Sequence, residues 1–172
     1  MIQFIYLLTS MKQKGMRHLL YREQQLSCDL QAAWSFFSTP QNLSTITPKE
    51  MGFRVRKPID SAPIYEGMEI DYWVSPFLNI PLKWKTQITQ VDFQQSFTDF
   101  QLNGPFKYWS HHHQFLENEL GVLMIDSVEY ELPMGPIGKL AHRLLIRKKL
   151  ERIFTFRFEV LERRFNRRSV SV

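Results

Sequence analysis

Three side chains in the second half of the sequence could do chemistry together: His111, His113 and Asp126. Each belongs to a run in which apolar and polar residues alternate, and residues two apart in such a run share one face of a strand. Turn-forming residues over 117–121 separate the two runs, so we expect an antiparallel hairpin. Directly opposed residues of such a hairpin lie on the same side of the sheet. The pattern therefore predicts an imidazole and a carboxylate side by side on the inner face.

Two registers of this hairpin fit the alternation. Pairing Phe115 with Val122 places His111 opposite Asp126, whereas a shift by two residues places His113 there. A shift by one residue would reverse the two faces. Either of the first two registers brings an inward histidine next to the carboxylate.

The cluster has three interpretations. The imidazole and the carboxylate can satisfy each other's hydrogen bonds in an apolar interior. They can instead anchor a ligand, with Asp126 fixing the histidine tautomer. Two histidines and a carboxylate are also ligand types of non-haem iron. We expect no metal, because neighbouring strands place these groups in a flat row, and His112 points to the opposite face.

The elements that must position these groups follow from turn signals and periodicity. A strand is predicted over residues 17–27, then a short helix with Asp29 as N-cap, ended by Pro40, and a second helical turn over 41–48. Further strands are predicted before the hairpin over residues 53–57, 68–75, 82–92 and 96–102.

A long helix is predicted to follow the hairpin. Apolar residues recur there three or four positions apart, which is typical of one buried helix face. They are Ile137, Leu140, Ala141, Leu144, Leu145, Ile153, Phe156 and Val160. A single sheet curled around one such helix encloses space between the two.

Length and composition predict one globular domain. The 172 residues, 44% hydrophobic and 14% aromatic, suit a single domain over residues 16–166, with an N-terminal extension over 1–15 and a short tail over 167–172. The single Cys28 excludes an internal disulfide, which fits a cytoplasmic protein. We expect a monomer or a weak homodimer.

Positive charge is concentrated near the C-terminus. Residues 139–168 carry eleven Lys or Arg against three Glu, and the rest of the chain is net negative. Arg143, Arg147, Lys148 and Arg152 could touch an anionic membrane or an acidic partner, making the chain a membrane-surface or protein-interaction module. The same pattern is typical of a solvated helix face. We expect no nucleic acid, because no aromatic stacking motif accompanies the basic run.

Several motifs carry a resemblance to a known family. They are Gly104-Pro105-Phe106, the run from Trp109 to Phe115, the run from Asp126 to Tyr130, and Pro133-Met134-Gly135. Over residues 17–165 the chain resembles the START and birch-pollen-allergen-like superfamily, called SRPBCC. The motifs are similar to those of a bacterial ligand-binding, polyketide-cyclase-like branch.

The resemblance implies an α+β helix-grip fold: a curved antiparallel sheet around a long C-terminal helix, with two short helices after the first strand. It implies a carrier or sensor for a small apolar ligand, such as a lipid, an isoprenoid or quinone, or a polyketide-like molecule, without a cofactor. The alternative is a cyclase, dehydratase or isomerase using His111 or His113 with Asp126. The residues expected at the ligand are Tyr72, Trp84, Phe100, Trp109, His111, His113, Asp126, Tyr130 and Leu145.

Overall fold

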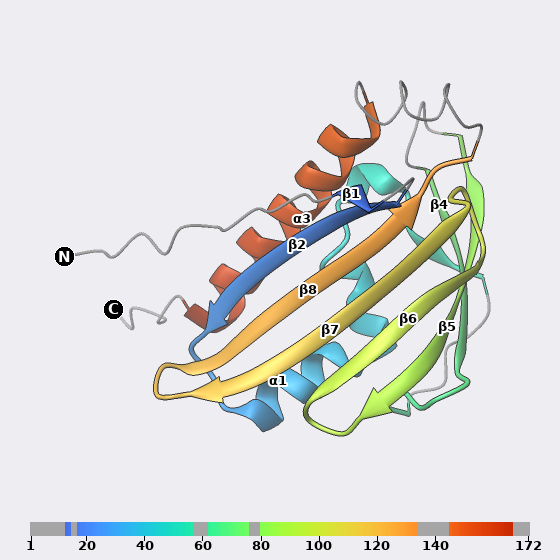
Figure 1. The fold of residues 1–172 in the computed structure, drawn as a ribbon. Helices are drawn as coiled ribbons and strands as arrows, with labels where there is room; N and C mark the ends of the chain where they lie inside the picture. Colours follow the sequence, from blue (N-terminus) through green and yellow to red (C-terminus); the bar gives the residue numbers. More distant parts are fainter. Residues whose placement is uncertain (1–12, 15–16, 57–61, 76–79, 134–144, 167–172) are drawn as a thin grey trace.

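The computed structural model describes residues 13–14, 17–56, 62–75, 80–133 and 145–166. Eight strands form one antiparallel sheet in the order β1-β2-β8-β7-β6-β5-β4-β3 (Figure 1). The strands are β1 (Gln13–Lys14), β2 (Arg17–Leu26), β3 (Arg54–Val55), β4 (Glu69–Val74), β5 (Leu82–Asp92), β6 (Ser96–Asn103), β7 (Tyr108–Asn118) and β8 (Gly121–Glu131).

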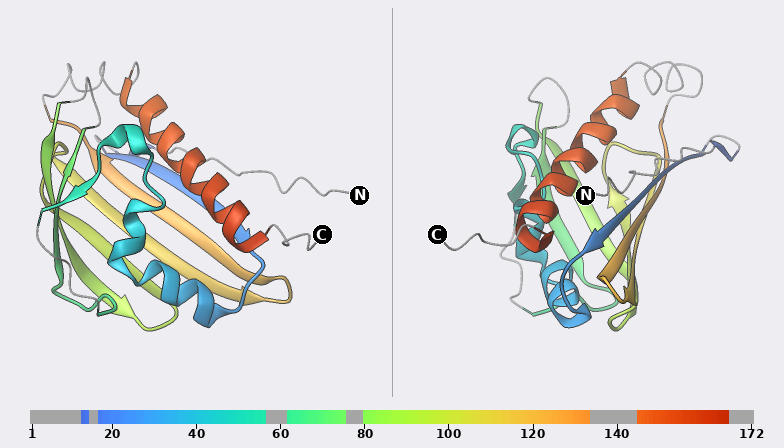
Figure 2. Two further views of the ribbon diagram at one scale, coloured as in Figure 1. Left: turned by 180° about the vertical axis from the view of Figure 1, so that it is seen from behind. Right: turned by 90° about the vertical axis from the view of Figure 1, so that its left-hand side faces the viewer.

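Helices cover the concave side of this sheet (Figure 2). After β2 come α1 (Leu30–Phe37) and the 3₁₀ turns η1 (Pro40–Ser44) and η2 (Lys49–Met51), and after β8 comes α3 (Arg147–Leu161), which continues into the π-helical η4 (Glu162–Asn166). The predicted α+β helix-grip architecture is thereby confirmed. The predicted helix start over 137–144 lies outside the described residues, as do residues 1–12 of the predicted extension and the tail over 167–172.

Helix α1 begins where the sequence predicts. Asp29 is its N-cap, and its side chain accepts a hydrogen bond of 2.7 Å from the backbone N–H of Ala32. Trp34 and Phe37 on its buried face reach the ring of Phe115 on β7, with ring centroids 5.8 and 5.3 Å away. The helix therefore closes one end of the concave side.

The turn between β7 and β8 sets the hairpin register. Asn118 pairs with Gly121, which places His113 opposite Asp126, the second of the two predicted registers. Gly121 has φ 117°, and a Cβ there would lie 2.3 Å from the carbonyl oxygen of Leu26. Glycine is required at this corner because a side chain has no room and the backbone is left-handed.

The β5–β6 pairing is interrupted twice, and this helps the sheet curve. Register shifts occur between Lys85 and Thr86 and between Ile88 and Gln90. Irregularities of this kind bend a strand and increase its twist. The sheet can therefore wrap around the helices instead of lying flat against them.

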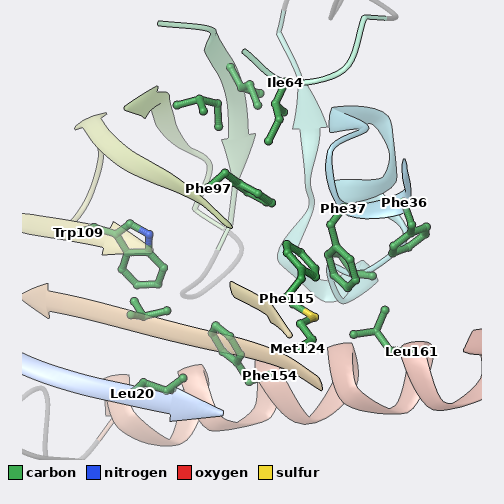
Figure 3. Close-up of a cluster of buried hydrophobic side chains, with 14 of the residues drawn as sticks. Leu20, Phe36, Phe37, Ile64, Phe97, Trp109, Phe115, Met124, Phe154 and Leu161 are labelled. Atoms are coloured by element: carbon green, nitrogen blue, oxygen red, sulfur yellow. The ribbon is translucent and has the colours of Figure 1, made fainter. Parts of the chain in front are cut away.

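Helix α3 buries a narrow apolar stripe. Leu150, Phe154 and Leu161 are its buried residues, and Figure 3 shows Phe154 and Leu161 within the core cluster. The predicted Ile153 and Val160 lie at the edges of this stripe, where they are half-buried and pack against the core. The stripe holds α3 on the inner face of the sheet.

Polar contacts fix the end of α3 against β2. Gln24 donates from Nε2 to the carbonyl oxygen of Phe158 at 3.0 Å and to the carboxylate of Glu162 at 2.9 Å. Asn166 donates to the carbonyl oxygen of Gln25 at 2.8 Å. The remaining length of α3 can therefore stand over the sheet and enclose space.

Candidate functional site

A cavity of about 180 Å³ lies between the sheet and the helices. Its wall is formed by the inner faces of β4, β5, β6 and β7, by α1 and η1, and by one side of α3. Most of the lining is apolar, including Phe37, Ile70, Phe97 and Phe154. A concave, mostly apolar space of this kind is the usual form of a small-molecule site.

Four ionisable side chains meet in one corner of the cavity. His111 donates from Nε2 to Asp126 Oδ1 at 2.9 Å, and His113 donates from Nε2 to Asp99 Oδ2 at 3.4 Å. His113 Nδ1 also lies 2.7 Å from Asp126 Oδ1, without the alignment of a hydrogen bond. His111 Nδ1 lies 3.5 Å from Asp99 Oδ2. Each imidazole therefore stands between the two carboxylates.

Arg157 of α3 completes the cluster from the opposite side. It donates from its guanidinium to Asp126 Oδ2 at 3.1 Å, and its side chain is only 11% exposed. Asp126 thus binds an arginine through one oxygen and contacts both imidazoles through the other. A buried carboxylate with such partners is stabilised in its charged form.

The two imidazoles have opposite pKa shifts. Burial, together with the neighbouring His113, lowers the pKa of His111 to about 4. For His113, burial also acts to lower the pKa, but the two carboxylates outweigh it and the pKa is raised. Burial opposes ionisation of Asp126, yet Arg157 and both histidines hold its pKa well below the usual range. The raised pKa of His113 favours its protonated form beside Asp126, whereas the lowered pKa of His111 favours its neutral form.

Several solved structures share this architecture at low sequence identity. A START superfamily protein from Mycobacterium smegmatis superposes with a TM-score of 0.63 at 11% identity, covering 86% of this chain and 96% of that one. Ginseng major latex-like protein 151 from Panax ginseng gives 0.54 at 19% identity, covering 80% and 97%. A protein from Thermus thermophilus gives 0.64 at 16% identity, covering 85% and 95%. The chain has a START-like helix-grip fold.

No protein-family model matches the sequence, and no curated protein does. The START-like assignment rests on structural similarity to solved proteins. This similarity establishes the fold but does not identify a ligand. The predicted resemblance is confirmed at this level.

Five of the predicted ligand residues line the cavity of the START-like fold. They are Tyr72, Trp84, Trp109, His111 and His113. Asp126 does not border the cavity, because it lies behind the two imidazoles in contact with Arg157. Tyr130 is fully buried and packs behind Trp109, with ring centroids 6.1 Å apart. These two residues support the cavity wall without forming it.

Two of the residues expected at the ligand, Phe100 and Leu145, do not line the cavity. Phe100 points away from it, because β6 directs Phe97 and Asp99 inward, and its ring packs edge-on against Tyr108 on the outer face at 5.5 Å. Leu145 precedes α3 and is 61% exposed. In β6 the aromatic residues lie on both faces, so period two could place only one of them inside.

The sequence prediction missed Asp99 and Arg157. Asp99 pairs directly with His111 across β6 and β7, and the alternation that points Phe97 inward also points Asp99 inward. Arg157 falls three residues after Phe154 and four before Leu161, on the buried stripe of α3. The spacing of each residue in the sequence indicates an inward side chain. Both were overlooked because charged residues such as Asp99 and Arg157 usually lie at the protein surface.

One polar atom near the cavity is buried without a partner. The indole Nε1 of Trp84 has no hydrogen-bond acceptor, although Trp84 is only 8% exposed and lines the cavity. An unpaired buried N–H costs about 1–3 kcal/mol. An acceptor on a bound molecule would remove that cost.

The predicted membrane-contact residues lie at the start of α3. Arg147 pairs with Glu151 at 3.0 Å, Arg152 pairs with Glu50 at 3.4 Å, and Lys148 is exposed. Arg143 lies outside the described residues. No helix in the described part of the chain is both long and apolar enough to cross a bilayer. Contact with anionic lipid stays a prediction, which flotation with anionic and neutral vesicles at low and high salt tests.

Proposed function

We propose that this protein is a carrier or sensor that binds a small, mostly apolar molecule bearing a hydrogen-bond acceptor. The observation that carries the proposal is the apolar cavity, which is lined in part by Trp84, a residue whose indole N–H has no partner. Apolar walls supply most of the affinity of such sites, and a few fixed polar groups orient the guest. Trp84 Nε1 is suited to that second task.

The size of the cavity restricts the guest. An engineered apolar cavity of about 150 Å³ in another protein admits benzene. The present space of about 180 Å³ accordingly suits a molecule of one or two rings, or a short branched chain. Isoprenoid, quinone and polyketide-like fragments combine an apolar body with a carbonyl or hydroxyl oxygen. Such an oxygen could accept from Trp84.

Native mass spectrometry of freshly purified protein is the direct experiment. We expect an adduct of discrete mass that is released by organic extraction and identified as an apolar molecule with at least one oxygen. A uniformly ligand-free protein that also fails to bind a neutral apolar probe would overturn the proposal.

A cavity-filling variant locates the binding. Ile153 lines the cavity, so Ile153→Trp should weaken binding of 2-naphthol, a fluorescent two-ring probe, about tenfold or more, a change of about 1.4 kcal/mol. Thr155→Trp is the matched control, because Thr155 lies on the same helix and is exposed. Fluorescence titration measures both. Equal affinities of the two variants would place the probe outside the cavity.

The enzyme alternative has one observation in its favour. His111 and His113 both line the cavity, and their pKa values are shifted in opposite directions. Of two neighbouring imidazoles, the one with the lowered pKa could act as a base and the one with the raised pKa as an acid on a bound substrate. If His111→Ala leaves turnover of every active cyclase, dehydratase or isomerase substrate unchanged, this alternative fails.

A further inference from the structure

Three groups on the inner face of β6 and β7 are spaced like metal ligands. Asp99, His111 and His113 each offer one ligand atom, and these atoms all lie within 4.8 Å of one another. Asp99 Oδ2 is 3.5 Å from His111 Nδ1 and 3.4 Å from His113 Nε2, and a bound ion would replace the proton that His113 Nε2 donates to Asp99. Ligand atoms bound tetrahedrally to zinc at about 2.0–2.1 Å are separated by about 3.3 Å. The two distances from Asp99 Oδ2 fit this separation, and the two ring nitrogens lie within 4.8 Å of each other.

The opposite nitrogens of the two imidazoles are held as in known metal sites. His111 Nε2 donates to Asp126 Oδ1 at 2.9 Å, and His113 Nδ1 lies 2.7 Å from the same oxygen. Histidines that bind metals nearly always direct their other ring nitrogen at a carboxylate, a carbonyl or water, which fixes the tautomer. Asp126 accepts a hydrogen bond from His111 and lies beside the ring nitrogen of His113, and Arg157 donates to its other oxygen at 3.1 Å.

A third strand removes the geometric objection that the sequence raised. Side chains from β7 and β8 alone form a flat row, which cannot surround an ion. Asp99 comes from β6, directly opposite His111 in the pairing. The carboxylate of Asp99 lies on one side of the imidazoles and that of Asp126 on the other. Asp99 can therefore bind the ion while Asp126 orients the two rings.

The remaining sides of such an ion would face the cavity. Asp99, His111 and His113 all line it, and Trp84 is part of the same wall. Three protein ligands with an open position are typical of catalytic zinc, and two histidines with one carboxylate are typical of non-haem ferrous iron. An oxygen of a bound molecule could take the open position.

We propose that Asp99, His111 and His113 bind one divalent transition-metal ion, zinc or ferrous iron, with Asp126 and Arg157 as positioning residues. The metal site goes beyond the apolar cavity, because it stands on the three ligand atoms whether or not an apolar guest binds. A bound ion would also give the cavity a Lewis acid at its polar corner.

Metal binding by the chelator-treated protein is the test. Isothermal titration with Zn²⁺ should give one site per chain, and Co²⁺ should give a visible ligand-field spectrum of low symmetry. Asp99→Asn and His111→Ala should each weaken Zn²⁺ binding by more than about 100-fold, and Asp126→Asn by about 10–100-fold. The Asp99→Asn change keeps side-chain shape, so loss of folding is not the expected reason.

His112→Ala is the matched control, because His112 lies between the two ligands but points to the outer face. It should leave Zn²⁺ affinity and the Co²⁺ spectrum unchanged. A dissociation constant above millimolar, or an equal loss in His112→Ala and His111→Ala, would overturn the proposal. Probe binding by the same variants is read separately, so failure of the metal site is distinguishable from failure of the apolar site.

Discussion

Three consecutive histidines on β7 face two different environments. His111 and His113 are 5% and 4% exposed on the inner face, between Asp99 and Asp126. His112 is half-buried on the outer face, and its Nδ1 lies 2.9 Å from the hydroxyl of Thr98. The residue type is the same, so the difference comes from strand alternation alone.

Charged side chains on the two faces of the sheet depend on their partners to different degrees. On the outer face, Arg17 and Glu129 are 3.6 Å apart with about half of each side chain exposed, so water solvates both and the pair contributes little. On the inner face, Asp126 is buried, and Arg157 of α3, with 11% of its side chain exposed, is its cationic partner. Losing one inner partner leaves an uncompensated charge, whereas losing an outer partner does not.

The largest expected effect is that of Asp126→Ala. The free energy of unfolding should fall by about 3–5 kcal/mol, because Arg157 and His113 lose a carboxylate partner in a buried site. Urea denaturation in the presence of a chelator measures this without any contribution from bound metal.

Ser127→Ala is the matched outer-face control, one residue further along β8. It should change the free energy of unfolding by no more than about 0.5 kcal/mol. If Asp126→Ala and Ser127→Ala lowered the free energy of unfolding equally, the buried charges would contribute no more to stability than an outer-face side chain.

Trp109 on the inner face and Trp73 on the outer face allow the two faces to be compared for apolar contacts. Trp109 packs inside against Trp84 and Phe106 at 5.3 and 4.7 Å, so Trp109→Ala should cost about 3 kcal/mol. Trp73 is half-buried beside the cations of Arg56 and Lys83, so Trp73→Ala should cost about 1 kcal/mol. Thermal and urea unfolding measure both. A larger loss in the free energy of unfolding for Trp73→Ala than for Trp109→Ala would contradict the assignment of Trp109 to the inner face and Trp73 to the outer face.

Much of the fold could be predicted because each element has a local signal. The strand over Leu82–Asp92 was predicted with the bounds that the structure has, since apolar and polar residues alternate along most of it, from Leu82 to Thr89. The N-cap role of Asp29 was readable from one side chain. These features depend on neighbours in sequence, so the sequence alone contains the necessary information.

The site was only partly predictable, because its geometry depends on contacts between distant segments. Both hairpin registers satisfied the alternation, and the tight Asn118–Gly121 corner beside Leu26 decides between them. Asp99 and Arg157 join the cluster from β6 and α3, whose positions relative to β7 are set by packing of the whole core. The spacing of Arg157 to Phe154 and Leu161 places it on the buried stripe, but only the packing of α3 against the sheet brings it to Asp126.

The smallest expected effect concerns Cys28, at the rim where β2 leaves the sheet. Burial raises the pKa of its thiol, and the adjacent Asp29 raises it further. A raised pKa leaves less thiolate at a given pH, so alkylation by iodoacetamide should be slower at pH 8 than for a free cysteine, whose pKa is about 8.5. The pH dependence of the alkylation rate measures the pKa, because Cys28 is the single cysteine.

Asp29→Asn separates the two causes. Asparagine caps a helix as well as aspartate does, so α1 should keep its start while the negative charge is removed. The alkylation midpoint should then move to lower pH but stay above that of free cysteine, because burial is the larger cause. A wild-type midpoint at or below the free value would show that even this rim position is solvated like the outer face. The effect of burial on ionisable groups would then be confined to the inner face of the sheet and would not extend to Cys28.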